Sequence, residues 1–199
     1  MRTGIFGGSF DPVHLGHRRL AEFLQEALSL DRMLIIPAYV SPFKERTAAP
    51  DADRLAMCRL QFPEAHFTVS DMEIAASTRS YTLLTVQKLR EQYPADAFFL
   101  LVGSDSLFSF DRWYHFAEIL QQVTLVAVSR EADETQVMEA FAEKNLRPFG
   151  TVRILPFTPL PVSSTRLREA LREGKDTSGY LDESVKEYII KKKLYKGTP

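Results

Sequence analysis

Two histidines near the N-terminus, in the segment His14-Leu15-Gly16-His17, are the side chains of this sequence that are best placed for chemistry. They are three positions apart at the start of a predicted helix, so their rings share one face of that helix. The amino end of a helix also supplies unpaired N–H groups and a partial positive charge, which suit a phosphate group. The pair therefore predicts an anion site at the mouth of the core.

The glycines around the histidines favour the same kind of ligand. An apolar run ends at Gly7-Gly8, directly before the predicted helix. Glycine lets the backbone approach a ligand closely, and ligands of open α/β sheets bind beyond the carboxyl ends of the strands. Gly16 gives up about 1 kcal/mol of helix propensity relative to alanine, which is explained if something lies against the backbone there.

Two common phosphate motifs are excluded by the spacing. The fingerprint G-x-G-x-x-G would need glycine where Phe10 and Asp11 stand, and a P-loop would need a following Gly-Lys-Ser/Thr. A zinc site is not expected, because the other histidines, His66 and His115, fall in no ligand-spaced cluster. A purely structural alternative stays open, namely two histidines that cap a helix beside a tight glycine turn.

Apolar runs alternate with amphipathic stretches along the chain. Short continuous apolar strands between helices indicate a parallel sheet that is covered on both faces. The predicted fold class is therefore α/β, a Rossmann-like doubly wound parallel sheet with helices on both faces and a small C-terminal helical part. We expect one domain over 1–199, with about 160–199 as the C-terminal helical subregion. The predicted strands are 3–6, 33–38, 66–74, 97–105, 123–130 and 151–157, and the predicted helices are 15–28, 52–62, 81–93, 132–145, 164–172 and 182–193.

The composition limits the classes of function. The chain has 199 residues, 45% of them hydrophobic, and a formal net charge of −1. A sequence-independent nucleic-acid binder carries a clear basic excess, so no nucleic-acid partner is expected. The single cysteine, Cys58, excludes a disulfide within the chain and fits a reducing compartment. Since no signal peptide and no apolar run of membrane length is predicted, we expect a cytoplasmic protein without a membrane partner.

The segment GGSFDPVHLGH resembles the signature of the nucleotidyltransferase superfamily that carries an HxGH or TxGH motif. Within that superfamily the chain is similar to bacterial nicotinate-nucleotide adenylyltransferases. The similarity covers nearly the whole chain and rests on the further stretches SPFKE, SYTLLTV, GSDSLFSFDRWYHFAEIL, VSSTRLR and SVKEYIIKKKLY. One departure is visible, because Phe43 stands where the family commonly has histidine before the Lys44 position.

The resemblance implies a reaction in which the phosphate of nicotinate mononucleotide attacks the α-phosphorus of ATP. The products are nicotinate adenine dinucleotide and pyrophosphate, in NAD biosynthesis. The nucleophile is already an anion, so catalysis needs in-line positioning and neutralisation of charge rather than a base. The expected partners are ATP and nicotinate mononucleotide, and the expected cofactor is Mg²⁺ bridging the ATP phosphates with few protein ligands. The oligomeric state, a homo-oligomer included, is left open.

The resemblance also implies roles for individual residues. His14 and His17 would donate hydrogen bonds to the α- and β-phosphates, while Lys44 and Arg168 would place cations on the triphosphate or the leaving group. No set of metal-ligating side chains is assigned. The expected ATP site comprises Gly7, Gly8, Ser9, Phe10, Gly16, Gly103, Asp105, Ser163, Ser164 and Thr165. The expected nicotinate mononucleotide site comprises Lys44, Thr82, Trp113 and Tyr114.

Several of these residues have structural alternatives on sequence grounds. Asp105 could accept a ribose hydroxyl, assist a metal or cap a helix. Trp113 could stack on the pyridine ring, as the resemblance implies, or belong to the core. Arg166 and Arg168 point about 200° apart on a helix, so only one can face the site, and the family motif favours Arg168.

Two other functions remain in competition. The first is a sister adenylyltransferase that acts on another phosphate acceptor such as phosphopantetheine, and the HxGH form of the motif together with Trp113 weighs against it. The second is a nucleotide-binding sensor that has lost its chemistry. Retention of His14, His17, Lys44 and Arg168 together weighs against this sensor.

Overall fold

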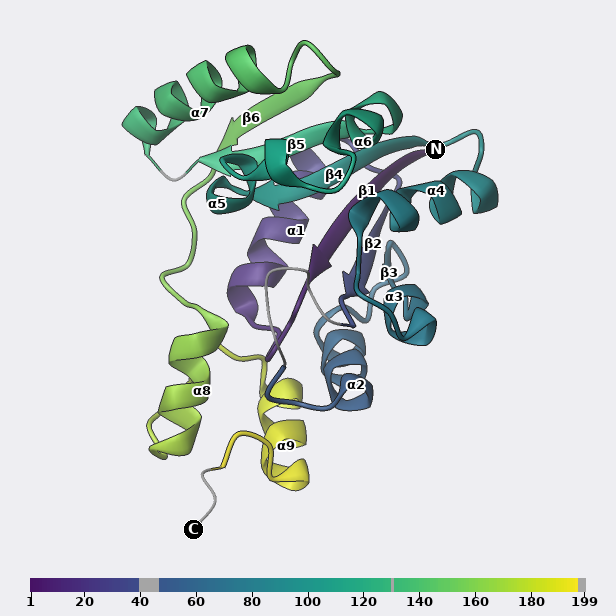
Figure 1. The fold of residues 1–199 in the computed structure, drawn as a ribbon. Helices are drawn as coiled ribbons and strands as arrows, with labels where there is room; N and C mark the ends of the chain where they lie inside the picture. The colour runs from purple at the N-terminus through teal and green to yellow at the C-terminus, as the bar shows by residue number, and fades with distance from the viewer. Residues whose placement is uncertain (40–46, 130, 197–199) are drawn as a thin grey trace.

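The computed structural model describes residues 1–39, 47–129 and 131–196. Within these residues six parallel strands form one sheet in the order β3-β2-β1-β4-β5-β6 (Figure 1). The strands are β1 (Arg2–Gly8), β2 (Arg32–Pro37), β3 (Phe67–Val69), β4 (Ala97–Gly103), β5 (Thr124–Ser129) and β6 (Val152–Pro156).

The order of the strands creates one special position in the sheet. The chain runs outward from β1 to β2 and β3, returns to β4 on the other side of β1, and runs outward again to β5 and β6. The connection after β1 therefore runs toward the β3 edge of the sheet, and the connection after β4 runs toward the β6 edge. In open α/β sheets, ligands bind beyond the carboxyl ends of the strands at this switch point. Gly8 and Gly103 end the two strands there.

Both faces of the sheet are buried under helices, which explains why the strands are continuously apolar. Ile5 and Phe6 alternate across β1, so Ile5 joins one core cluster and Phe6 the other. The predicted α/β doubly wound fold is confirmed. The helices that contribute buried residues to the Phe6 cluster are α1 (Leu15–Ala27), α2 (Asp51–Gln61), α8 (Ser164–Arg172) and α9 (Glu183–Lys192). Those on the Ile5 side are α4 (Thr82–Gln92), α5 (Ser104–Leu107), α6 (Phe116–Gln122) and α7 (Ala132–Asn145).

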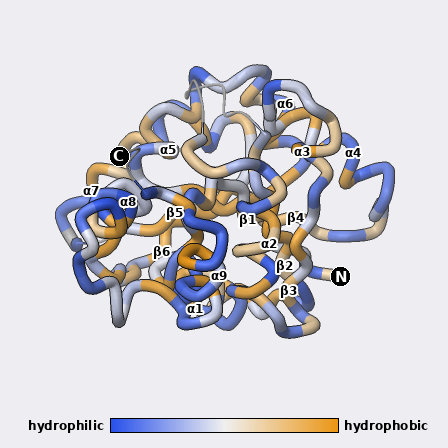
Figure 2. Tube along the Cα trace, turned by 90° about the horizontal axis from the view of Figure 1, so that it is seen from below, coloured by the Kyte–Doolittle hydropathy of each residue, from blue (hydrophilic) through white to orange (hydrophobic). Residues whose placement is uncertain are grey.

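The hydropathy of the chain follows these layers. Figure 2 shows apolar segments running through the strands in the interior, while hydrophilic segments lie mostly at the periphery, α7 and α8 among them. Within the described residues, no helix combines the length and apolarity needed to cross a membrane.

The C-terminal helices lie beyond the carboxyl ends of the strands, and α9 packs against α2 (Figure 1). They share the core of the sheet, because Leu167, Val185 and Ile189 belong to the Phe6 cluster. Helix α8 ends at Arg172, as predicted, and Gly174 follows two residues later with a φ of +67°, a left-handed conformation that glycine adopts without strain.

The sequence prediction is wrong in one segment and incomplete in another. The strand predicted over 66–74 ends at Val69, and α3 (Met72–Ala76) follows it. A weak alternation over so few residues does not distinguish strand from helix, and the helix is held by a tertiary hydrogen bond to Glu73 from Thr85. The short helices α5 and α6, and the 3₁₀ turn Phe110–Arg112, were not predicted. Each has fewer than eight residues, too few for a clear helical period.

Candidate active site

A cavity of about 570 Å³ opens at the carboxyl ends of β1 and β4, at the switch point of the sheet. Its walls combine the end of β1, the end of β4, the start of α4 and the Trp113-Tyr114 segment. The cavity thus joins residues expected for ATP with residues expected for nicotinate mononucleotide. The predicted site residues in its lining are Gly7, Gly8, Ser9, Thr82, Gly103, Trp113 and Tyr114.

Two glycines leave the cavity wall open. A Cβ atom added at Gly7 or at Gly103 would meet no atom within 4 Å, so bare backbone faces the space where a ligand would lie. Gly16 has a different role. A Cβ there would lie 2.8 Å from Cγ1 of Val162 and 3.0 Å from Nδ1 of His14, so close packing within the protein already requires glycine at this position.

The two histidine rings share one face, as predicted, and stack on each other with 3.7 Å between their centroids. The backbone N–H of His14 donates to Nδ1 of His17 over 3.2 Å. Since Nδ1 accepts, the proton of the neutral His17 ring is on Nε2, which makes Nε2 a donor for a phosphate oxygen. The His17 ring lies edge-on to Phe10 at 5.0 Å and 6.1 Å from the ring of Phe6, a residue of the cavity wall.

The amino end of α1 is partly occupied by the protein itself. The N–H of Leu15 donates to the carbonyl oxygen of Tyr180 over 2.9 Å, and the N–H of His17 donates to the carbonyl oxygen of His14. These N–H groups are therefore not open to a phosphate, which corrects the simple expectation of unpaired donors at the helix start. The imidazole rings of His14 and His17 add N–H groups of their own at this helix start.

Burial keeps His14 neutral at ordinary pH. The residue is 6% exposed, and desolvation lowers the pKa of its ring from 6.5 to about 4. A neutral imidazole still donates one hydrogen bond, so the ring can contact a phosphate without carrying a charge in the free protein. The negative charge of a bound phosphate would favour protonation, which couples ligand binding to the state of this ring.

His14 should also make the stability of the folded protein depend on pH. Between pH 6.5 and 4 the unfolded chain binds a proton at this position that the folded protein excludes, so the unfolding free energy falls as the pH falls. The loss should reach about 3 kcal/mol at pH 4, and His14→Gln should abolish it. Urea unfolding at several pH values between 7 and 4 measures both slopes. His66→Gln serves as the control, and equal slopes for wild type and His14→Gln would contradict the assignment.

A buried arginine holds the ends of β1 and β2 beneath the site. Arg54, on α2, is fully buried and donates from Nη1 to the carbonyl oxygen of Ser9 and from Nη2 to that of Ala38, over 2.7 and 2.6 Å. Its charge is paired with Asp51 at 2.5 Å. Sequence analysis missed this residue, although an Asp-x-x-Arg spacing at the start of a predicted helix is a usable signal of such a pair.

The start of α8 is hydrogen-bonded to the backbone just before the histidine pair. Ser163 is the N-cap of α8, and its Oγ accepts from the backbone N–H of Arg166 over 3.3 Å. Oγ of Ser164 donates to the carbonyl oxygen of Pro12 over 3.0 Å. Contact of these serines with a phosphate stays a prediction.

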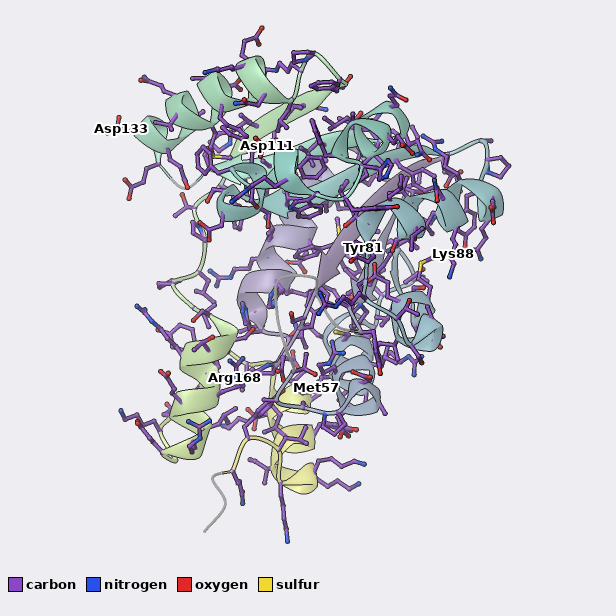
Figure 3. All side chains as sticks on the ribbon, viewed as in Figure 1. Met57, Tyr81, Lys88, Asp111, Asp133 and Arg168 are labelled. Atoms are coloured by element: carbon purple, nitrogen blue, oxygen red, sulfur yellow. The ribbon has the colours of Figure 1, made fainter. Side chains whose placement is uncertain are left out.

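Arg168 faces the histidine segment, and Arg166 is exposed, as the helical phase predicts (Figure 3). Nη1 of Arg168 donates to the carbonyl oxygen of Asp11 over 2.7 Å, and Nη2 donates to Oγ1 of Thr165 over 3.3 Å. A guanidinium has five N–H groups, so these two bonds leave capacity for a phosphate. Arg168 therefore fixes the motif backbone and brings a cation beside it.

Trp113 and Tyr114 line the cavity together with the glycine backbone at the end of β1. The Trp113 ring is half-buried and packs on Phe110 with 4.7 Å between centroids, so it joins the core and lines the cavity at once. Tyr114 is 53% exposed and lies 5.2 Å from the ring of Tyr81. A flat ring at such a wall is suited to stack on another aromatic ring.

Helix α4 begins at this wall, just after Tyr81 (Figure 3), and hydrogen bonds hold its start in place. Oγ1 of Thr85 donates to the carboxylate of Glu73 over 2.6 Å, and Oγ of Ser80 accepts from the N–H of Tyr39 over 3.0 Å. Burial raises the pKa of Glu73, while its hydrogen bonds with Thr85 and Ser80 oppose that shift. Glu73 was missed on sequence grounds because it falls in the wrongly predicted strand.

Other predicted residues are absent from the cavity lining or lie outside the described residues. Lys44 and Phe43 lie outside the described residues, and the role of Lys44 stays a prediction. Asp105 is exposed in the first turn of α5. The predicted residues that are absent from the cavity lining are Phe10, Asp105, His14, Gly16, His17, Ser163, Ser164, Thr165 and Arg168.

The side chains fit a metal that is bound mainly through its substrate. Among the described residues, no three His, Cys, Asp or Glu side chains are grouped so that they could hold a metal ion. Magnesium commonly binds through one or two carboxylates together with substrate phosphates and water. The exposed carboxylate of Asp105, near the carboxyl end of β4, is compatible with that mode.

Comparison with known proteins gives one consistent result. Residues 5–170 match the cytidylyltransferase-like family. A protein of Geobacter sulfurreducens named "Probable nicotinate-nucleotide adenylyltransferase" is 36% identical, with 98% of this chain and 98% of that protein covered. A protein of the same name from Laribacter hongkongensis is 37% identical, with 97% of this chain and 94% of that protein covered.

A solved structure shares the fold over nearly its whole length. The nicotinic acid mononucleotide adenylyltransferase of Plasmodium falciparum, complexed with NaAD, superimposes with a TM-score of 0.77 at 19% identity. The match covers 98% of this chain and 97% of that chain. The resemblance inferred from the motifs is confirmed. The chain belongs to the cytidylyltransferase-like family and, within it, to the nicotinate-nucleotide adenylyltransferases.

Proposed function

We propose that this protein is a cytoplasmic enzyme that transfers the adenylyl group of ATP to nicotinate mononucleotide in NAD biosynthesis. The observation that carries the proposal is the cavity at the switch point between β1 and β4. One of its walls consists of the glycine backbone that leads to the histidine pair, and the other consists of Trp113 and the start of α4. Such a cavity suits two nucleotides that meet at their phosphates.

The side chains around the histidines act by positioning and by charge. Nε2 of His17 donates to the oxygens of the reacting phosphates, where negative charge builds up in the transition state. Arg168 adds a cation from α8, and Lys44 is proposed to add another from the sequence motif alone. The carboxylate of Asp105 would help to hold Mg²⁺ on the ATP, and the metal would supply positive charge that offsets part of the charge of the phosphates. No side chain needs to remove a proton, because the attacking phosphate is already an anion.

The opposite wall is proposed to recognise the acceptor. Trp113 offers a ring face for the pyridine ring, and Thr82 begins α4 beside it. Backbone N–H groups in the first turn of a helix are donors, so they pair with a carboxylate. The amide of nicotinamide mononucleotide would place an NH₂ group against these N–H groups, and two donors cannot form a hydrogen bond with each other.

The acceptor should therefore be the acid form of the mononucleotide rather than the amide. We expect kcat/KM for nicotinate mononucleotide to exceed that for nicotinamide mononucleotide by at least about tenfold, because a site loses affinity when its buried donors are left unpaired. Pyrophosphate release from ATP, measured with each acceptor in turn, gives both values. Equal values would sink the assignment of the Thr82 wall.

The same assay separates the competing functions. Phosphopantetheine in the acceptor panel tests the sister transferase, since a preference for it would replace the proposed acceptor. The sensor alternative predicts ATP binding without pyrophosphate release for every acceptor. Pyrophosphate release that depends on nicotinate mononucleotide excludes both alternatives.

A further inference from the structure

The buried carboxylate of Asp11 connects three distant parts of the chain. It is 5% exposed and accepts hydrogen bonds from the backbone N–H groups of Ala48 and Ala49, over 2.6 and 3.1 Å. Its third donor is the hydroxyl of Tyr195, at 2.7 Å from Oδ1. Asp11 thus ties the segment before α2 and the C-terminal tail to the histidine segment.

Tyr195 reaches this position from beyond the end of α9. Its ring packs against the Phe6 core cluster, and its own φ of +61° turns the backbone after the helix. Burial and the hydrogen bond with Asp11 raise the pKa of the Tyr195 hydroxyl, so this hydroxyl stays protonated and remains a donor. The contact joins residues that are 184 positions apart.

The backbone of Asp11 lies between the side chains that are proposed to act on the phosphates. Its carbonyl oxygen holds Nη1 of Arg168, and His14 follows three residues later. Phe10, the preceding residue, is buried with a φ of +46° and packs edge-on against the His17 ring. A displacement of the Asp11 side chain would therefore move the backbone that aligns both the arginine and the histidine pair.

We propose that Tyr195 is a positioning residue of the active site, which acts through Asp11 to hold the Ser9–His14 segment in its reactive geometry. The inference rests on the proposed adenylyl transfer. It assigns a role in catalysis to the C-terminal tail, in which the sequence resemblance implies no site residue. A hydroxyl that only fastened the tail would affect stability and leave the reaction unchanged.

The chain offers a matched control for this proposal. Tyr188, on α9, also donates its hydroxyl to an aspartate over 2.7 Å, to Oδ1 of Asp53 on α2. That bond fastens the C-terminal helices to the same core but does not touch the histidine segment. Tyr195→Phe and Tyr188→Phe each remove one hydroxyl and keep the ring.

We expect kcat of Tyr195→Phe to fall by about tenfold while its KM for ATP changes by less than about twofold, because small misplacements cost alignment more than binding. Tyr188→Phe should keep wild-type kcat, although both variants should lose Tm, by at most about 10 °C. In an Asp11→Ala background, which has no acceptor for the Tyr195 hydroxyl, Tyr195→Phe should lower kcat little further, since the linkage is already broken. Equal kcat for the two phenylalanine variants, or additive losses in the double variant, would overturn the proposal.

A second measurement tests whether Tyr195 holds Asp11 in place, and it does not depend on the reaction. Amide hydrogen exchange at Ala48 and Ala49 should be faster in Tyr195→Phe than in Tyr188→Phe, because their acceptor loses one of its anchors. Unchanged exchange at these two positions would contradict the linkage. An inactive wild-type protein would refute the proposed function, whereas the exchange result would still stand for or against the Tyr195–Asp11 contact.

Discussion

Replacing His17 by alanine should lower kcat on the order of 10²–10³-fold, with a much smaller change in the KM for ATP. The reason is that, in the proposed mechanism, Nε2 of His17 donates to charge that develops only in the transition state. The N–H of His14 holds Nδ1, and Phe10 packs edge-on against the ring, so the donor is already fixed in direction before substrate arrives. Steady-state kinetics with varied ATP separates the two parameters.

His66→Ala is the control for this experiment. His66 lies directly before β3, at one edge of the sheet, and its ring packs beside Phe67 at 4.3 Å. The variant removes an imidazole of the same type from a position that neither lines the cavity nor belongs to the stacked His14–His17 pair. Wild-type kcat in His17→Ala, or an equal loss in His66→Ala, would show that the phosphate site has been assigned to the wrong residues.

The second large effect is expected at Arg168. Arg168→Ala should lower kcat/KM for ATP by about tenfold to somewhat over a hundredfold, which corresponds to about 1.5–3 kcal/mol for a charge-assisted contact. Two losses combine in this variant, because the guanidinium both offers a cation and holds the carbonyl oxygen of Asp11. Arg168→Lys should recover only part of the activity, since an ammonium has no fork.

Arg166→Ala provides the comparison on the same helix. The Arg166 side chain is exposed, and its backbone N–H, which the substitution keeps, makes the cap with Ser163. Its loss should change stability by at most about 0.5 kcal/mol and leave activity nearly unchanged. If Arg166→Ala were the more damaging variant, the phosphate site would have to be redrawn around Arg166.

The sequence alone determined those features that depend on neighbours in the chain. Apolar runs and helical periods are local patterns, so the six strands were located within a few residues, apart from the overextended third. Helical geometry likewise set the shared face of His14 and His17 and the opposed directions of Arg166 and Arg168. The motifs were enough to predict the family, because a motif is defined by residue types at fixed spacings along the chain.

Only the tertiary structure decided how the site is held together. The cavity depends on β1 and β4 being neighbours, and strand order follows from packing between distant segments rather than from local pattern. Arg54 on Ser9 and Tyr195 on Asp11 join residues 45 and 184 positions apart, so no spacing in the sequence points to them. The same holds for Val162 against Gly16, where a glycine that suggested a ligand is required by packing. The hydrogen bonds of Arg54 and Tyr195 form because polar groups buried by folding must find partners, and close packing fixes Gly16; both requirements act in space, not along the chain.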